Sequence, residues 1–158
     1  MKKWRAMVCG LALASCMSFP AFAAGNMAEY RQEAASVKQE IKEVKASMDV
    51  LRGKIKEESK QFNEERKVKK ENKELKAQKE EYKQAKEKKQ NIDQVRVRLS
   101  ENSGQYKVLR AEAKVELNAG NYDAALDKMN KALEAKRESL KCLEDINGIW
   151  AEIEGIVQ

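Results

Sequence analysis

The sequence predicts an all-α protein built from long helices of the coiled-coil type. Charged residues make up 37% of the chain and aromatic residues 6%, a composition that helical rods share with disordered chains. Proline occurs once and glycine seven times, so few residues interrupt a helix. Apolar residues recur every three or four positions over long stretches, and this periodicity favours helices over disorder. We expect a long N-terminal helix and a charged helical stalk, followed by a C-terminal antiparallel αα-hairpin.

The first 23 residues have the features of a signal peptide. Lys2, Lys3 and Arg5 precede an apolar stretch that is too short to span a bilayer comfortably. Pro20 ends this stretch, and the small residues that follow it predict cleavage after Ala23. We therefore expect an exported protein that is extracellular, at the cell surface or in a periplasm.

A second processing route competes with cleavage after Ala23. The segment 13–16, Leu-Ala-Ser-Cys, is similar to a lipobox, in which Cys16 would carry a lipid and anchor the protein. The apolar stretch before Cys16 is short, which favours the soluble product, and the anchored product stays open as the alternative. We expect contact with a membrane only if Cys16 is lipidated.

Cleavage after Ala23 would change both the charge and the cysteine count. It removes three of the 32 basic residues and none of the 26 acidic ones, which leaves a net charge of about +3. A charge this small does not by itself predict nucleic-acid binding. Only Cys142 would remain, so an intramolecular disulfide is excluded. We expect Cys142 to be a small buried residue on a helix, with a bridge between two subunits as the alternative.

The stretch from 24 to 62 carries a sustained heptad pattern. Its apolar residues alternate steps of four and three, and only Glu58 breaks the series. A 3.5-residue repeat forms a narrow apolar seam along one side of a helix, which packs against another helix. We expect self-association, or binding of a partner, through this seam: Tyr30, Val37, Ile41, Val44, Met48, Leu51, Ile55 and Phe62.

The next stretch, from 63 to 91, is a run of charges. Of its 29 residues, 11 are basic and 7 are acidic, and opposite charges recur three and four positions apart. Each such pair adds only about 0.2–0.5 kcal/mol to a helix, but many together can hold an exposed one. We expect a solvated helical stalk; a basic surface for anionic polymers or lipid headgroups is the less favoured interpretation. Whether residues 63–104 form one continuous helix stays open.

The last stretch, from 92 to 158, predicts an antiparallel helical hairpin with its turn at 118–121. Gly120 can adopt the positive φ that ends a helix, and Asn121 can cap the helix that follows. Tyr122 begins the apolar face of that helix.

The hairpin has a geometric consequence for the rest of the chain. Folding back at this turn brings together residues whose numbers add to about 240, such as Leu133 and Tyr106. The apolar face of the last helix then packs against the helix before it. The seam at 24–62 is therefore expected to have no partner within the chain, and to pair with a second copy or with a different protein.

Residues 106–137 resemble a single tetratricopeptide repeat. The segment 120–126, Gly-Asn-Tyr-Asp-Ala-Ala-Leu, and the Lys-Ala-Leu-Glu at 131–134 are similar to the turn and second helix of that family. Glu112 and Glu116 stand where the family places large apolar residues, and no second copy is present, although such repeats need neighbours. The resemblance implies a helical hairpin and not a peptide-binding groove.

Catalytic machinery is not predicted. The chain has no histidine, which removes the commonest general base and the commonest metal ligand. It also has no phosphate-binding glycine loop. We expect no enzyme activity and no catalytic, cofactor-binding or metal-binding residues.

Two functions fit these features. The first is a non-enzymatic structural or adaptor protein of the cell envelope or extracellular space, a homo-oligomer or a binder of another helical protein. The second is an extracytoplasmic holdase chaperone for unfolded clients. Its basic helical arms behind a signal peptide resemble Skp-type chaperones, although no segment for that family's β-strand core is present. A binder of membrane surfaces fits less well, because the seams are narrow and the stalk is rich in acids.

Overall fold

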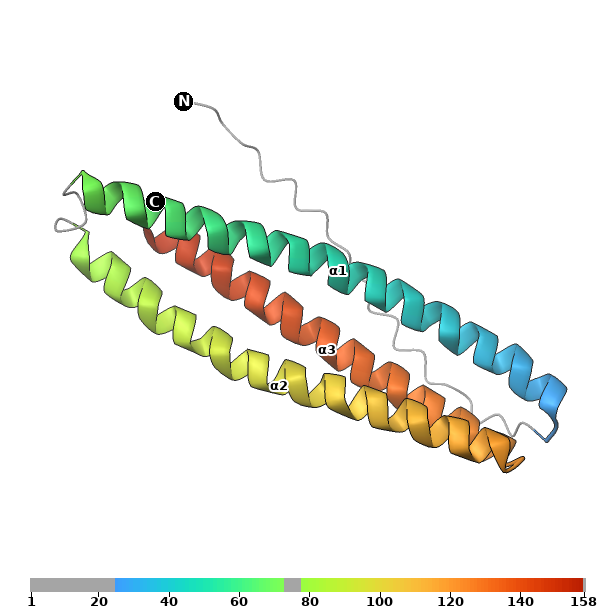
Figure 1. Ribbon diagram of the computed structural model, residues 1–158. Helices are drawn as coiled ribbons and strands as arrows, with labels where there is room; N and C mark the ends of the chain where they lie inside the picture. The colour runs from blue at the N-terminus through green and yellow to red at the C-terminus, as the bar shows by residue number, and fades with distance from the viewer. Residues whose placement is uncertain (1–24, 73–77, 158) are drawn as a thin grey trace.

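The computed structural model describes residues 25–72 and 78–157, which form three long helices (Figure 1). The bounds are Met27–Glu71 for α1, Lys79–Asn118 for α2 and Tyr122–Val157 for α3. These described residues contain no strand. The predicted all-α fold class is therefore confirmed.

The predicted signal peptide, residues 1–23, lies outside the described residues together with Cys16 and the cleavage position. The first described helix begins with a side-chain cap. The side chain of Asn26 accepts hydrogen bonds from the backbone N–H groups of Ala28 and Glu29, at 2.9 and 3.1 Å. None of the three helices, over their described length, contains a stretch long and apolar enough to cross a membrane.

α3 is the central helix of the bundle and packs against both others (Figure 1). α1 and α3 run parallel. At one end the Tyr30 hydroxyl donates a hydrogen bond to the sulfur of Met129, and toward the other end the Phe62 ring lies beside Trp150. Positions about 90–100 residues apart thus face each other along the whole α1–α3 interface.

α2 and α3 form the predicted antiparallel hairpin. Lys128 pairs with Glu112, and Lys88 pairs with Glu152, so facing residue numbers add to 240 in both cases. The turn between the helices contains Gly120 at a φ of 79°, a conformation that side chains with a Cβ rarely adopt. The hairpin register and the role of this glycine are both as predicted.

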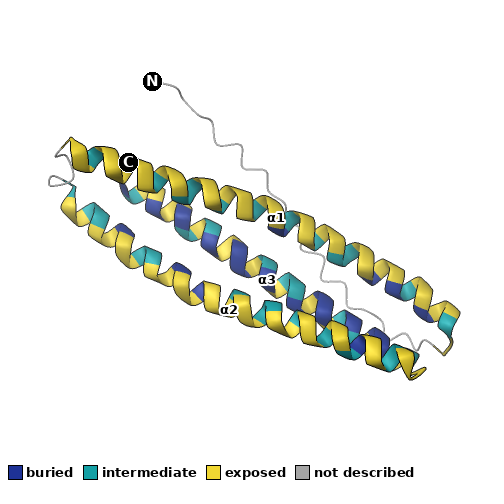
Figure 2. Ribbon diagram, in the orientation of Figure 1, coloured by how far each residue is buried: buried dark blue, intermediate teal, exposed yellow. Residues whose placement is uncertain are grey.

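Apolar residues of all three helices form two clusters along the bundle. Figure 2 shows that buried residues are most frequent on α3. The buried residues of the first cluster, near the α2–α3 turn, are Tyr30, Ala34, Val37, Ala113, Ala125, Leu126, Met129 and Leu133. Those of the second cluster, toward the opposite end, are Met48, Ala85, Ile92, Val95, Cys142, Leu143, Ile146, Trp150, Ile153 and Val157. The stretch of α3 between Leu133 and Leu140 separates the two clusters and is largely polar.

The predicted seam of α1 is packed against α3 of the same chain. Tyr30, Val37 and Met48 are buried, and the remaining seam residues are partly buried in the same two clusters: Ile41, Val44, Leu51, Ile55 and Phe62. The expectation that the seam lacks a partner within the chain is therefore wrong. The reason is the width of the apolar face of α3, which is broad enough to pack against α2 on one side and α1 on the other.

The charged stretch predicted as a stalk is divided between two helices. α1 ends at Glu71 and α2 begins at Lys79, so residues 63–104 are not one continuous helix. The predicted segment boundaries at 62 and 91 fall inside α1 and α2. Reversing the chain here lets the apolar residues of α2 reach α3, and that burial outweighs the weak charge pairs that would support a straight helix.

Candidate functional site

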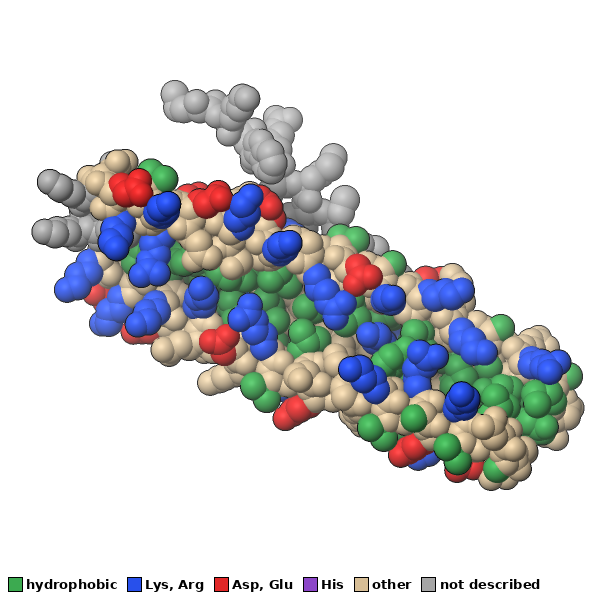
Figure 3. All heavy atoms as spheres, in the orientation of Figure 1, with side chains coloured by type: hydrophobic (Ala, Val, Ile, Leu, Met, Phe, Trp, Pro, Cys, Tyr) green, Lys and Arg blue, Asp and Glu red, His purple; other side chains and the backbone are tan. Residues whose placement is uncertain are grey.

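α1 and α2 both pack on α3, and their backbones stay apart from each other. No Cα atom of α1 lies within 8 Å of a Cα atom of α2 in the described residues. Because Cα atoms lie on a cylinder of about 2.3 Å radius, the two axes are more than about 10 Å apart, beyond the about 8–10 Å of helices in direct contact. We call the side of the bundle between α1 and α2, which faces the viewer in Figure 3, the open face.

The open face combines apolar and basic side chains. In Figure 3 a strip of apolar side chains follows the middle of this face, and lysine and arginine side chains lie along both of its sides with few acidic ones between them. The exposed side of α3, by contrast, is rich in acids: Asp123, Asp127, Glu134, Glu138, Asp145 and Glu152. Four of these acids are paired with a lysine or arginine: Asp127, Glu138, Asp145 and Glu152. Among the described residues, the open face is thus rich in unpaired cations, and the outer side of α3 has charges of both signs.

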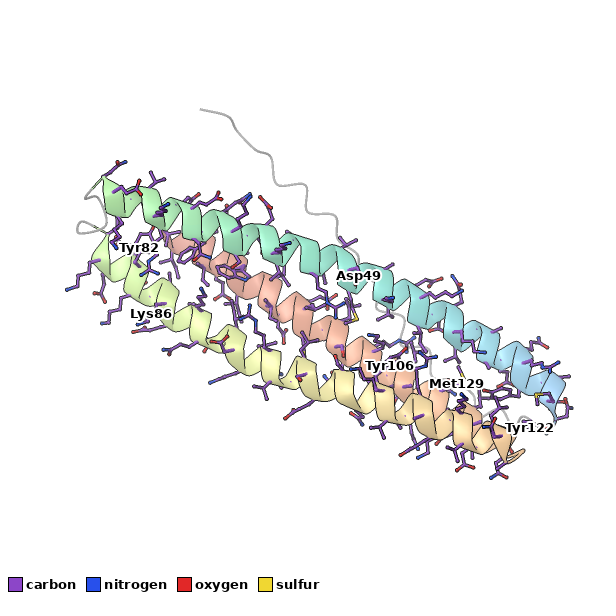
Figure 4. All side chains as sticks on the ribbon, in the orientation of Figure 1. Asp49, Tyr82, Lys86, Tyr106, Tyr122 and Met129 are labelled. Atoms are coloured by element: carbon purple, nitrogen blue, oxygen red, sulfur yellow. The ribbon has the colours of Figure 1, made fainter. Side chains whose placement is uncertain are left out.

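Aromatic side chains link α1 and α2 at one end of the open face. The ring of Phe62 lies between Tyr82 and Trp150, with centroid distances of 6.0 and 5.7 Å. Two ammonium groups lie over these rings, that of Lys69 over Tyr82 and that of Lys89 over Trp150, each 5.8 Å from the centroid. Figure 4 shows Tyr82 at this end of the bundle, near the α1–α2 connection.

Four cations from all three helices gather in the middle of the bundle. Three of them, Lys45 and Arg52 on α1 and Lys107 on α2, are close enough to act on the charge of the half-buried Lys136 of α3, and we call these four residues the basic cluster. Burial lowers the pKa of Lys136, the charges of Arg52, Lys45 and Lys107 lower it further, and the nearby carboxylate of Asp49 opposes them. The positive charges thus outnumber the negative ones around this amine.

The ring of Tyr106 forms one wall of the basic cluster. The ammonium group of Lys136 lies 4.7 Å from the centroid of that ring, and the guanidinium of Arg110 lies 5.7 Å from it. Arg110 also donates a hydrogen bond of 3.3 Å to the Tyr106 hydroxyl. Figure 4 places Tyr106 on α2 and Asp49 on α1, on opposite sides of the open face. Stacking on the ring keeps the lysine amine within the open face, where an anion can reach it.

Lys136 differs from its neighbours on α3 in its ion pairing. Arg137 pairs with Glu40 of α1 at 2.6 Å, and Lys128 pairs with Glu112 of α2 at 2.6 Å. In the described residues, no carboxylate lies within 4.0 Å of the Lys136 amine. A cation placed between two packed helices without a carboxylate is the feature of this bundle that most suggests a ligand.

The predicted turn residues have structural contacts. Gly120 makes the turn itself, and the side-chain amide of Asn121 donates a 2.7 Å hydrogen bond to the Glu116 carboxylate. The ring of Tyr122 packs against Tyr30, with a centroid distance of 6.1 Å. These contacts close the end of the bundle at the start of α1.

The lone thiol of the described chain is buried, as expected. Cys142 is 5% exposed, and its sulfur lies 3.8 Å from the side-chain nitrogen of Asn102, which donates to it. Burial raises the pKa of the thiol, so its reactive thiolate form is suppressed. No group of three or more acidic or cysteine side chains in the described residues is arranged to hold a metal ion.

Sequence reasoning missed the basic cluster. Lys45, Arg52, Lys107 and Lys136 are spread over three stretches of sequence, and all but Lys107 have an acidic residue within three positions in the chain. A signal exists only in part: Lys136 lies one helical turn from both Leu133 and Leu140, on the apolar side of α3. The other three cations come close to it only once the three helices are assembled.

No protein-family model, no curated protein and no solved structure matches this chain. The residues that resemble a tetratricopeptide repeat, 106–137, cover the end of α2, the turn and the first part of α3. α2 alone has 40 residues, more than the about 34 of a whole repeat.

Proposed function

We propose that this protein is an exported, non-enzymatic adaptor that binds a helix of another protein on its open face. The observation that carries this proposal is the separation of the backbones of α1 and α2, which both pack on α3 and are linked by the side chains of Phe62 and Tyr82 at one end. A helix laid between α1 and α2 would contact all three helices and complete a four-helix arrangement.

The chemistry of the open face supports a helical partner. An amphipathic helix buries its apolar stripe, and the apolar strip between α1 and α2 offers a surface of matching shape. Each side of the strip carries cations, which suit the polar flanks of such a helix. The open face has the combination of apolar centre and charged rim that is typical of protein interfaces.

The seam of α1 is less suited to this role. Met48 is fully buried and Val37 is 4% exposed, so a partner could use them only by displacing α3. Losing these contacts would cost about 2–5 kcal/mol for each large apolar side chain. We therefore place the proposed partner on the open face and not on the predicted seam.

A holdase chaperone is the second candidate, and one observation favours it. Five valines are more than half exposed: Val50, Val68, Val97, Val108 and Val115. Val97, Val108 and Val115 follow one stripe along the outer side of α2, away from α3. Exposed apolar side chains in a row are the kind of surface to which an unfolded segment adheres.

Mapping of a bound probe helix tests the adaptor proposal. The probe is a synthetic amphipathic helix of about four heptads, titrated into the isotope-labelled chain from residue 24 onward. We expect amide shifts in α1 and α2 where they border the open face, centred on Lys45 and Lys107, with Val97 and Val115 unaffected. Shifts confined to the valine stripe of α2, together with protection of an unfolded client from aggregation, would favour the chaperone. Absence of binding overturns the adaptor proposal.

A further inference from the structure

The middle of the bundle is polar on α3. Between the two apolar clusters, α3 carries Lys136, Arg137 and Ser139 in succession on or beside its packed faces. The Ser139 hydroxyl is satisfied locally, since it donates to the carbonyl of Ala135 at 2.9 Å, and Arg137 has its carboxylate on α1. Lys136 is the member of this group that directs a full charge onto the open face, over the ring of Tyr106.

The charged neighbours of Lys136 are mostly cations from the other two helices. Arg52 and Lys45 approach from α1 and Lys107 from α2, and Asp49 is the carboxylate that opposes them. Asp49 is itself engaged by Arg52, with a nitrogen–oxygen distance of 3.0 Å. In the described chain, neither Lys45 nor Lys107 takes part in an ion pair within 4.0 Å. An incoming anion would meet three lysine amines that have no carboxylate of the described residues within ion-pair distance.

We infer that the basic cluster is the recognition site for a carboxylate on the partner helix, so that the open face selects an acidic amphipathic helix. This inference rests on the proposed function and adds the chemistry of the partner to it. Arg52, Lys45 and Lys107 all act electrostatically on the Lys136 amine, so a glutamate or aspartate brought to that amine by a helix between α1 and α2 is attracted by all four cations. The apolar strip on either side of the cluster then takes the partner's apolar residues.

Charge complementarity decides against the other occupants. Two copies of this chain cannot join open face to open face, because like charges would lie opposite each other. The outer side of α3 is a poor match for the open face of another copy, because four of its acids are already paired with cations: Asp127, Glu138, Asp145 and Glu152. Its exposed residues are also mainly charged and would leave the apolar strip uncovered. A separate helix that carries both apolar and acidic residues satisfies the strip and the cluster together.

Three probe helices with a common apolar seam test the inference. They differ only at the flanking positions, which are all glutamate, all glutamine or all lysine. Binding to the chain from residue 24 onward is measured by fluorescence anisotropy at low and high salt. We expect the glutamate helix to bind about tenfold more tightly than the glutamine helix, an advantage that several weak ion pairs together can supply. The lysine helix is expected to bind most weakly, and high salt should reduce these differences.

Matched variants connect this preference to the basic cluster. Lys136→Gln should remove most of the advantage of the glutamate helix, and Lys107→Gln, at an exposed position, should remove part of it. Lys131→Gln is the control: it changes the net charge equally, on the outer side of α3 where Lys131 pairs with Asp127. A second readout is the side-chain pKa of Lys136 from NMR, which should rise when the glutamate helix binds and not when the glutamine helix binds.

The outcomes separate the two proposals. If the glutamate and glutamine helices bind equally well, the open face is a helix-binding site and the inference about the basic cluster is wrong. If none of the three helices binds, the proposed function itself fails. If unstructured polyglutamate or polyphosphate binds as well as the glutamate helix, with the same dependence on Lys136, the site recognises polyanions and the inference of a helical ligand is overturned. Salt-sensitive self-association in sedimentation that Lys136→Gln abolishes would replace the partner helix by a second copy.

Discussion

The indole of Trp150 lies against the ring of Phe62, with centroids 5.7 Å apart, although 88 positions separate the two residues in the chain. This contact joins the second half of α1 to the last turns of α3, and the neighbouring Tyr82 brings α2 to the same place. Aromatic pairs of this kind add about 0.5–1.5 kcal/mol beyond the burial of their surface. The contact shows that the seam of α1 is a structural element of this bundle, and the first prediction follows from it.

Met48→Ala should destabilise the fold by about 2–5 kcal/mol, because a fully buried side chain at the α1–α3 interface is lost. Chemical denaturation measures this loss. The control is Val50→Ala, whose side chain is 72% exposed and whose replacement should change stability by less than about 0.5 kcal/mol. If the seam packs within one chain, the denaturation midpoint will not depend on protein concentration. A midpoint that rises with concentration would mean that the seam is shared between copies.

Glu58→Leu should stabilise the fold by about 1–3 kcal/mol, because it replaces a buried carboxylate oxygen that has no hydrogen-bond partner. The Glu58 side chain is 20% exposed and lies among Phe62, Trp150 and Val157. Glu57→Leu, one position along and exposed, is the control and should have little effect.

The gain from Glu58→Leu should depend on pH. Burial raises the pKa of this carboxyl above its ordinary value of 4.5, the nearby Lys54 partly offsets the rise and Glu154 adds to it. A raised pKa means that the folded state favours the protonated form of Glu58 and disfavours the charged form. The free energy of unfolding of the wild-type protein therefore falls as pH rises through the pKa of Glu58 in the folded state. The stabilisation should therefore be larger at pH 7 than at pH 4. Equal gains at both values would contradict a role for the charge.

Lys136→Met should raise the stability at neutral pH by less than about 1 kcal/mol, since the amine keeps part of its hydration. The pKa of Lys136 is lowered by burial and by its cationic neighbours, so its charge opposes folding below that pKa. The free energy of unfolding therefore rises as pH increases through the lowered pKa of Lys136. Above the ordinary value of 10.5 the amine is neutral in both the folded and the unfolded state, and its charge no longer opposes folding. Thermal denaturation of this variant beside Lys131→Met checks the prediction, and an equal gain in both would contradict it.

Two glycine substitutions should act in opposite directions. Gly120→Ala should cost about 1–2 kcal/mol, because the residue has a φ of 79°. Gly104→Ala should add about 0.4–1 kcal/mol, because it lies inside α2 with no atom near the position of a new Cβ. Denaturation of the two variants measures both changes. Stabilisation by Gly120→Ala would show that the turn has a different geometry.

Cys142 should react with a thiol reagent such as Ellman's reagent about a hundredfold more slowly in the native protein than in denaturant, because reaction requires local opening of the bundle. Val50→Cys, at an exposed position of α1, supplies a second thiol that should react at once. A disulfide-linked dimer through Cys142 on a non-reducing gel would contradict the buried position and restore the alternative of a bridge between subunits.

Local sequence was sufficient for the elements and for one of the two helix pairings. The steps of three and four from Tyr30 to Phe62 predicted a helix with a narrow apolar seam, and that helix is present. The α2–α3 register was also predictable, since Gly120 marks a tight turn and a tight turn leaves antiparallel helices only one alignment. Cys142 could be recognised as a buried residue from the apolar periodicity around it.

The partner of the seam and the location of the basic cluster were decided by tertiary structure. Heptad spacing predicts that Met48 packs against another helix. It does not identify that helix, because an interface within a chain and one between chains have the same pattern. The charge run was likewise compatible with a straight stalk, and the reversal between Glu71 and Lys79 arises from burial gained far away along α2 and α3. Lys45, Lys107 and Lys136 are separate surface lysines in the sequence, and only the packing of three helices gives them a common electrostatic environment.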